Sequence, residues 1–297
     1  MACKLSVIVP TKYINDENLR DLGRSIDMQD FPKDQLEVLI ISEGTSESAK
    51  AIGIKQAKGE VICFLASDNE LMNRNTLWNG YVFASEHGAA YPAYYHYDRN
   101  DNVLNRYFAL IGGNDVLSFY IGKNDRLSHA HPTSHLAHDC TIGDNGYFIQ
   151  KRLIEKTDLD NYYHIDNALE ASRNISTKVF THSIWHKTGG NIFHFLAKRY
   201  RYGLQHAFNK NRRWHLVDFT KPGDVWKLVL FISFSLTLLQ PLYFSIRGYL
   251  KKPDVAWCMH PIMSLATVFL YGVLVAHIIL RRLLSLSPSA PTDDRRA

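Results

Sequence analysis

The sequence predicts an α/β protein with a mixed, mainly parallel sheet flanked by helices, followed by a strongly apolar C-terminal region. Three short apolar runs, Leu5–Val9, Leu36–Ile41 and Val61–Leu65, have the length and composition of buried strands. Amphipathic stretches separate them, so strands and helices alternate within the first 65 residues. This order is typical of right-handed crossovers in a doubly wound sheet. Two long uncharged segments follow residue 225.

The local patterns support each of these elements in turn. Pro10 stops the first apolar run, and the helix expected at 18–28 has two leucines and an isoleucine at helical spacing. A second amphipathic helix is expected at 47–58, where Gly59 is a typical residue just past the C-terminal end. After a third helix near 75–86, a tyrosine-rich run is expected to form another strand. The alternation of strands and helices therefore continues beyond the third strand.

The third strand runs directly into a group of oxygen-bearing side chains, Ala66-Ser67-Asp68-Asn69-Glu70. In open α/β sheets, ligands bind beyond the carboxyl ends of the strands. Asp68 and Glu70 therefore stand where a hard cation and a phosphorylated ligand could meet. The alternative interpretation is that Ser-Asp-Asn is only a turn or an N-cap before the next helix.

The composition limits the class of protein. Of the 297 residues, 46% are hydrophobic and 21% are charged, and the formal net charge is +5. Residues 1–224 have the composition of a soluble α/β protein, whereas residues 225–284 are much more apolar. The four widely spaced cysteines form no C-x-x-C pair, so we expect reduced thiols in a cytoplasmic compartment. No cleavable signal peptide is expected, and the P-loop and G-x-G-x-x-G motifs do not occur.

Three segments taken together resemble the nucleotide-binding half of family 2 glycosyltransferases of the GT-A fold. They are LSVIVPT, LEVLIISEGTSE and AKAIGIKQAKGEVICFLASDNE. The resemblance covers about 210 residues, the size of one domain. It implies a nucleotide sugar, linked to UDP or GDP, as the donor substrate. The residues that the resemblance assigns to donor binding are Pro10, Thr11, Glu43, Gly44, Lys50, Ser67 and Asp68.

Two loops differ from the family pattern. The second loop is Ser42-Glu43-Gly44-Thr45, where the family usually has Asp-Asp-Gly-Ser and binds the base. The third loop is Ala66-Ser67-Asp68, where the family has Asp-x-Asp, so the first aspartate is absent. By the resemblance, Asp68 keeps the role of ligand to Mg²⁺ or Mn²⁺, and the contact to the ribose is weakened.

A histidine after the last strand often completes the metal site in GT-A enzymes. This points to His186 as the second metal ligand beside Asp68, with His182 as the next candidate. Four histidines between His129 and His138 are another possible metal cluster. No cysteine or carboxylate pattern completes a zinc site there, so a loop lining the acceptor cleft is the favoured interpretation.

The resemblance also implies the acceptor and catalytic residues. The segment CTIGDNGYFIQKRL resembles the Gly-Asn-Gly strand that runs under the acceptor, so Asn145 and Gly146 are expected at the acceptor. Asp166 stands where the family has its catalytic base, preceded by Ile165 where the family has Glu. The alternative role for Asp166 is an N-cap of a helix that begins near Asn167.

The C-terminal region predicts attachment to a membrane. Residues 191–224 are basic and amphipathic, which favours an interfacial helix on anionic lipid, with a solvated helix as the alternative. Leu228–Ile246 and Val255–Leu280 carry no charge and could each cross about 30 Å of hydrocarbon. They predict a transmembrane helical hairpin with both ends in the cytoplasm, although its short linker is also basic. The tail 285–297 is expected to be disordered.

These expectations combine into one hypothesis. A cytoplasmic GT-A domain at residues 1–190 would be joined by residues 191–224 to two helices of the cell membrane at 225–284. The protein would be a metal-dependent, inverting glycosyltransferase of polysaccharide biosynthesis, with a lipid-linked glycan acceptor in cell-surface glycan or glycolipid assembly. One alternative is a polyprenyl-phosphate sugar synthase, whose acceptor is already ionised. Another is a catalytically silent membrane protein that binds sugar nucleotides, because position 66 lacks the family's aspartate. No nucleic acid partner is expected.

Overall fold

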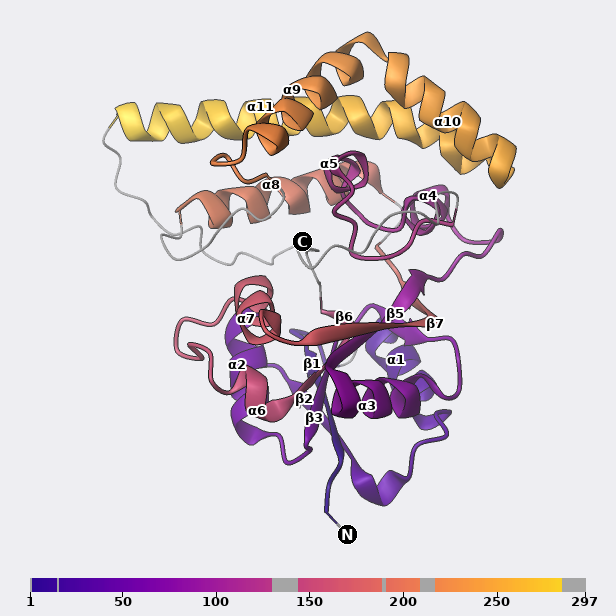
Figure 1. The fold of residues 1–297 in the computed structure, drawn as a ribbon, viewed down its shortest axis with the longest axis vertical. Coiled ribbons are helices and arrows are strands. Elements are labelled where there is room, and N and C mark those ends of the chain that lie inside the picture. The colour runs from indigo at the N-terminus through magenta and orange to yellow at the C-terminus, as the bar shows by residue number, and fades with distance from the viewer. Residues whose placement is uncertain (1, 15, 130–143, 189–190, 209–216, 285–297) are drawn as a thin grey trace. The chain divides into compact units, whose positions relative to one another are not determined.

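The computed structural model describes residues 2–14, 16–129, 144–188, 191–208 and 217–284 (Figure 1). The chain divides into two compact units. The sheet unit comprises residues 1–96, 125–127 and 136–187. The helical unit comprises residues 97–124, 128–135 and 188–297.

Within the described residues, seven strands form one mixed sheet in the order β2-β1-β3-β6-β5-β7-β4. Parallel pairing joins β1 to β2, β1 to β3 and β5 to β7, and antiparallel pairing joins the remaining neighbours. The strands are β1 (Leu5–Pro10), β2 (Leu36–Ile41), β3 (Val61–Leu65), β4 (Asn69–Leu71), β5 (Gly88–Tyr95), β6 (Asn145–Gln150) and β7 (Ser176–His186). The predicted mixed α/β sheet and its first three strands are confirmed.

Helices flank this sheet. The helices of the sheet unit are α1 (Glu17–Asp27), α2 (Ser46–Gln56), α3 (Thr76–His87), α6 (Lys151–Ile154) and α7 (His164–Ser172), with a 3₁₀ turn η1 (Lys33–Gln35). Ile54 of α2 packs with Ile8 and Ile62 of the sheet, and all three side chains are fully buried. A Cβ on Gly53 would lie 2.5 Å from Ile8, so this helix needs glycine to lie so close to β1.

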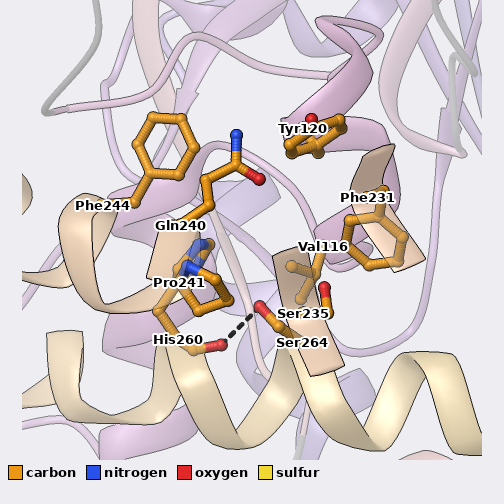
Figure 2. Close-up of a pocket in the computed structure, with 9 residues that line it drawn as sticks. All are labelled: Val116, Tyr120, Phe231, Ser235, Gln240, Pro241, Phe244, His260 and Ser264. Atoms are coloured by element: carbon orange, nitrogen blue, oxygen red, sulfur yellow. Dashed lines mark hydrogen bonds between the residues drawn. The ribbon is translucent and has the colours of Figure 1, made fainter. Parts of the chain in front are cut away.

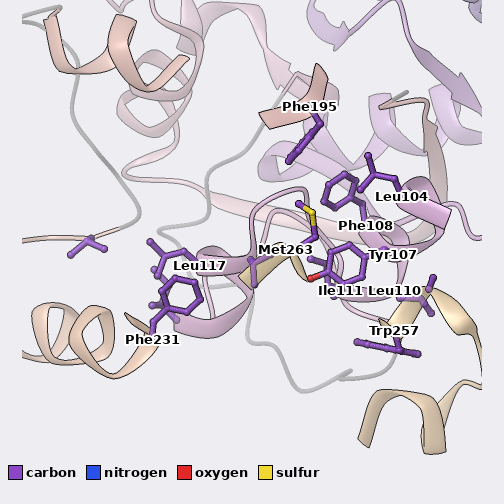
Figure 3. Packing of buried hydrophobic residues seen from close by; sticks show 14 residues of the cluster. Leu104, Tyr107, Phe108, Leu110, Ile111, Leu117, Phe195, Phe231, Trp257 and Met263 are labelled. Atoms are coloured by element: carbon purple, nitrogen blue, oxygen red, sulfur yellow. The ribbon is translucent and has the colours of Figure 1, made fainter. Parts of the chain in front are cut away.

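The helical unit has its own core, which Figure 3 shows. Its helices are α4 (Val103–Ile111), α5 (Val116–Ile121), α8 (Ile192–Phe208), α9 (Pro222–Thr237), α10 (Leu239–Lys251) and α11 (Met259–Leu283), with a 3₁₀ turn η2 (Val255–Cys258). Phe108 of α4 packs on Phe195 of α8, with 4.8 Å between ring centroids, and Met263 of α11 joins the same cluster. Residues 97–124, predicted as part of the N-terminal domain, therefore pack with the C-terminal helices.

The predicted first membrane span, 228–246, is not one continuous helix. It is divided between α9 and α10, which meet at Leu238 at an angle of 84°. Leu238 adopts a positive φ of 60°, and Pro241 cannot donate a hydrogen bond to the carbonyl of Thr237, four residues earlier. Of the described helices, the segment Val255–Arg281 alone is long and apolar enough to cross a membrane by itself, and the bent pair counts as a second span only if it is a broken one.

The break between α9 and α10 forms one side of a small pocket in the helical unit (Figure 2). The lining side chains come from α5, α9, α10 and α11 and are Val116, Tyr120, Phe231, Ser235, Gln240, Pro241, Phe244, His260 and Ser264. The Ser264 hydroxyl donates a 2.7 Å hydrogen bond to the backbone carbonyl of His260. Polar groups therefore lie among the apolar helices of this unit.

Candidate active site

The loops that follow β1, β2 and β3 lie along one edge of the sheet, because these three strands are neighbours and parallel. Pro10 ends β1, and the backbone N–H of Thr11 donates a 2.9 Å hydrogen bond to the carbonyl of Ile41 at the end of β2. Glu43 and Gly44 follow β2, where Glu43 is exposed and Gly44 has a positive φ of 72°. The predicted donor-binding loops are therefore brought together at this edge.

Asp68 and His186 form a pair at the same edge. Asp68 lies three residues after the end of β3. His186 is the last residue of β7, and it pairs with Asn69 where β7 runs antiparallel to β4. The Asp68 Oδ2 lies 3.5 Å from the His186 Nε2, and the two side chains are 22% and 11% exposed. The backbone N–H of Lys187 also donates a 2.9 Å hydrogen bond to the Asp68 carbonyl. The structure thus joins the two residues predicted as metal ligands.

The donor set of this pair suits a cation that is bound together with a phosphate. The described part of the chain contains no cluster of three or more His, Cys, Asp or Glu that could hold a metal by itself. Mg²⁺ and Mn²⁺ at phosphate sites use one or two protein carboxylates, and phosphate and water oxygens complete the shell. Asp68 and His186 meet this smaller requirement, so the residues present fit a cation that arrives with a diphosphate.

The other predicted candidates at this edge have different partners. The Glu70 carboxylate forms an ion pair with Lys187, whose Nζ also lies 2.8 Å from Asp21 Oδ2. His182 lies within 3.3 Å of both Thr76 and Asn79, so it connects β7 to α3. Burial lowers the pKa of His182, which keeps its ring neutral in this position. His131, His135 and His138 lie outside the described residues.

A buried chain of hydrogen bonds fixes the loop that carries Asp68. The Ala66 N–H donates to Asn69 Oδ1 at 2.9 Å, and Asn69 Nδ2 donates to Asn145 Oδ1 at 3.1 Å. Asn145 Nδ2 donates to the Tyr95 hydroxyl at 2.9 Å, and that hydroxyl donates to Asp125 Oδ2 at 2.5 Å. The four side chains are each less than 9% exposed. The shape of the Asp68 loop is therefore set by residues far away in the sequence.

Removing the Tyr95 hydroxyl should break this chain at its centre. In Tyr95→Phe, Asn145 loses an acceptor and Asp125 loses a donor in a buried place, so we expect the free energy of unfolding to fall by about 1–3 kcal/mol. Urea unfolding of the purified chain measures this. Asp125→Asn keeps an acceptor for the hydroxyl and should cost less. An unchanged stability in Tyr95→Phe would show that the network does not hold the loop.

Arg126 contacts two members of the same network, Tyr95 and Asn145. Its guanidinium is fully buried, lies 5.0 and 5.4 Å from the ring centroids of Tyr91 and Tyr95, and donates to the backbone carbonyl of Asn145. Gly146 follows with a positive φ of 78°, and a Cβ there would lie 3.0 Å from Ile184. Asn145, predicted at the acceptor, is only 5% exposed and its side chain points into the network. Its contacts in this structure are with other protein groups, and its predicted place at the acceptor stays a prediction.

Lys50, predicted to bind the donor, is held between two carboxylates. Its Nζ lies 2.9 Å from Asp144 Oδ2 and 3.2 Å from Glu47 Oε1, and its side chain is 3% exposed. Glu47 also accepts a 2.6 Å hydrogen bond from the His164 N–H. Burial alone would lower the pKa of Lys50 and raise that of Asp144, but the opposite charges outweigh it, so the lysine pKa is raised and the aspartate pKa is lowered. Both groups are ionised at neutral pH.

This ion pair should make stability depend on pH. Because the pKa of Asp144 is lower in the folded chain, its contribution is present above about pH 4 and is lost as the pH falls further. We expect Asp144→Asn to lower the free energy of unfolding by about 2 kcal/mol at pH 7. This is less than the loss expected when the single partner of a buried charge is removed, because Glu47 still faces Lys50. Urea unfolding should show this difference shrinking at pH 3.

The exposed Lys55–Asp160 pair is a matched control, since its Nζ–Oδ1 distance is also 2.9 Å. Its side chains are 54% and 86% exposed, so Asp160→Asn should leave stability unchanged at both pH values. Equal effects of the two substitutions at pH 7 would contradict the importance of burial for the Lys50 pair.

Asp166 lies in the first turn of α7. This helix begins at His164, so the predicted N-cap role of Asp166 before Asn167 is wrong. The Asn167 side chain instead accepts a 2.8 Å hydrogen bond from the Tyr163 N–H. The His164 ring packs 4.8 Å from that of Phe64 near the end of β3. Asp166 therefore lies in the first turn of a helix whose first residue, His164, contacts the strand that leads to Asp68.

Comparisons with known proteins give a partial likeness to glycosyltransferases. No family model matches the sequence. A poly(ribitol-phosphate) beta-N-acetylglucosaminyltransferase, TarS of Staphylococcus aureus, is 28% identical over 112 residues, which cover 28% of this chain and 19% of that protein. The match thus spans about a fifth of that relative.

Two solved structures show weaker likenesses. TarS residues 1–349 in complex with UDP-GlcNAc aligns over 93% of this chain and 92% of its own, with a TM-score of 0.42 and 17% identity. The mannosyltransferase PcManGT of Pyrobaculum calidifontis, in complex with GDP-Man and Mn²⁺, aligns over 96% of this chain and 88% of its own, with a TM-score of 0.48 and 15% identity.

Proposed function

We propose that this chain is a glycosyltransferase that moves a sugar from a nucleotide sugar to an acceptor at a membrane. The observation that carries the proposal is the Asp68–His186 pair, which stands at the edge where three parallel strands end. Ligands of open α/β sheets bind at this edge, and the pair suits a cation bound to a diphosphate. The sequence similarity to an acetylglucosaminyltransferase supports the same class of reaction.

Six residues of the site have a stated role in this proposal. Glu43 and Gly44 would face the base of a UDP- or GDP-linked donor, and Ser67 would lie beside its phosphates. Asp68 and His186 would hold Mg²⁺ or Mn²⁺, which when bound neutralises the charge that builds on the leaving diphosphate. Asp166 would take the proton of the attacking acceptor hydroxyl, because a sugar hydroxyl is a poor nucleophile at neutral pH. A single displacement of this kind inverts the anomeric centre.

The apolar C-terminal helices would keep the enzyme at the cytoplasmic face of the cell membrane, where a lipid-linked glycan is the acceptor in cell-surface glycan or glycolipid assembly. The length and composition of Val255–Arg281 support attachment to the membrane. A polyprenyl phosphate as the acceptor is the second candidate, and it would need Asp166 less because it is already ionised. Residues 191–224 would lie at the interface.

Binding and turnover can be tested separately on the full chain in detergent. Calorimetry with UDP- and GDP-sugars, with and without Mn²⁺, measures donor binding. Release of free nucleotide after adding a polyprenol-lipid extract then measures transfer. Metal-dependent binding with release supports an enzyme, and binding without release supports a silent binding protein. If no sugar nucleotide binds in the presence of Mn²⁺, the proposed function is wrong.

A further inference from the structure

Helix α11 is buried along one side only. At about 100° per residue, the buried side chains fall on one face of the helix, and they are His260, Met263, Ser264, Thr267 and Leu274. This face contacts α4, α5 and α8 of the helical unit. A Cβ on Gly203 of α8 would lie 2.4 Å from Leu274, so these two helices approach closely at that point. Protein therefore covers this side of α11 over most of its length.

Two charged side chains, Asp115 and Arg199, lie near the middle of α11, next to Tyr271. Tyr271, close to the centre of Val255–Arg281, donates a 2.7 Å hydrogen bond to Asp115 Oδ2. The guanidinium of Arg199 lies 4.0 Å from the same carboxylate and donates a 2.6 Å hydrogen bond to the carbonyl of Asn114. If α11 crossed a bilayer, this ion pair and a loop carbonyl would lie near the centre of the hydrocarbon. Such groups are strongly disfavoured at that depth.

Helix α10 has the pattern of a helix that lies at a membrane surface. At about 100° per residue, the exposed apolar side chains fall on one face, and the buried Pro241 and Gly248 fall on the opposite one. The exposed Arg247 and Lys251 lie along one border of the apolar face. The apolar face consists of Leu239, Leu242, Tyr243, Ile246, Tyr249 and Leu250, which are 48–77% exposed. An apolar face bordered by basic residues is typical of interfacial helices.

The neighbouring helices also carry exposed apolar side chains. Helices α9, α10 and α11 contact one another, and α9 and α11 add further exposed side chains such as Trp226, Leu236 and Phe269, which are 55–63% exposed. The two acidic residues of this region, Asp224 and Asp254, are paired inside the unit with Lys123 at 2.7 Å and Arg106 at 3.6 Å. The surface is therefore apolar with basic borders, which complements an anionic lipid leaflet.

We propose that α9, α10 and α11 lie flat in one leaflet of an anionic membrane and do not cross it. This inference rests on the proposed membrane location and replaces the transmembrane hairpin with an in-plane arrangement. The apolar faces of the three helices contact acyl chains, and the Asp115–Arg199 side of α11 faces away from the hydrocarbon. Both ends of the region and its basic linker 247–254 are then on the same side of the membrane.

The depth of three labels, one in η2 and two in α11, tests this directly. Val255→Cys, Gly272→Cys and Leu283→Cys each place a fluorophore at an exposed position, and a Cβ on Gly272 meets no atom within 4 Å. The full chain is reconstituted with phosphatidylglycerol-containing vesicles, and lipids that carry quenchers at known depths report the position of each label. The background replaces Cys3, Cys140 and Cys258 with Ser and keeps the fully buried Cys63.

An in-plane α11 gives three similar, shallow depths. A crossing α11 puts the label at residue 272 about 15 Å deeper than those at residues 255 and 283, and that result overturns the proposal. Leu250→Glu should weaken flotation of the chain with the vesicles at least several-fold, whereas Met28→Glu, at an exposed apolar position of the sheet unit, should not. A wild-type chain that does not float with any vesicle overturns the membrane location itself. Donor binding, measured separately by calorimetry, shows whether the proposed enzymatic function fails independently of either result.

Discussion

Asp68→Asn is expected to reduce sugar transfer by about a thousandfold or more, because it removes the one negatively charged ligand of the Asp68–His186 pair. The substitution keeps the size of the side chain, and the backbone contact between Lys187 and the Asp68 carbonyl remains. Since the carboxylate lies at the sheet edge, the free energy of unfolding should change by less than about 1 kcal/mol. The Mn²⁺-dependent part of donor affinity, measured by calorimetry, should disappear together with transfer.

Glu70→Gln is the matched control for this substitution. Glu70 lies two residues further along the chain, in β4, and its carboxylate pairs with Lys187. If Asp68 is the metal ligand, Glu70→Gln should keep Mn²⁺-dependent donor binding, even though it weakens a partly exposed ion pair. Loss of metal dependence in Glu70→Gln but not in Asp68→Asn would move the cation site along the loop. A wild-type rate in Asp68→Asn would refute the assignment.

The second large effect is expected for Asp166→Asn. If the acceptor is a sugar hydroxyl, the rate should fall by a factor on the order of one hundred or more, with donor affinity unchanged, because the variant keeps the shape of the base but cannot accept the proton. Single-turnover transfer with saturating donor measures this change. Glu170→Gln, at an exposed position on the same helix, should leave the rate unchanged.

The size of the Asp166 effect also separates the two candidate acceptors. A lipid phosphate already carries the negative charge of a nucleophile, so its transfer should depend little on a base. A nearly full rate for Asp166→Asn would therefore favour a polyprenyl phosphate over a glycan hydroxyl. A large loss of donor affinity in the variant would indicate that Asp166 shapes the donor site, and it would remove Asp166 from the role of base.

The parts of the fold that local sequence determines could be predicted. Strands β1, β2 and β3 are continuous or nearly continuous apolar runs, and Asp68 follows the third of them directly. The break at Leu238 had a visible signal in Pro241, since proline disfavours a continuous helix through that point. Apolar composition alone does not distinguish a crossing helix from one that is buried on one side, so the packing of α11 on α8 was not predictable.

The buried contacts that hold the site residues in place could not be predicted from the sequence. Asp125 and Arg126 follow two apolar helices with no periodic or motif signal, yet both reach the buried network around Asn145. Asp144 directly precedes β6 and has no motif signal of its own, and the pairing of β6 with β3 brings it beside α2 and Lys50. Contacts of this kind depend on tertiary packing, in which each partner comes from a different element.

The hydrogen-bond chain around Tyr95 has a consequence for protein engineering. The Asp68 loop takes its shape from side chains that lie up to 76 residues away from Asn69 in the sequence. A transplant of residues 66–70 onto another α/β sheet would therefore leave behind the groups that orient the loop. The smallest portable form of the site also includes Tyr95 and Asn145, on strands spaced as β5 and β6 are here, together with Asp125.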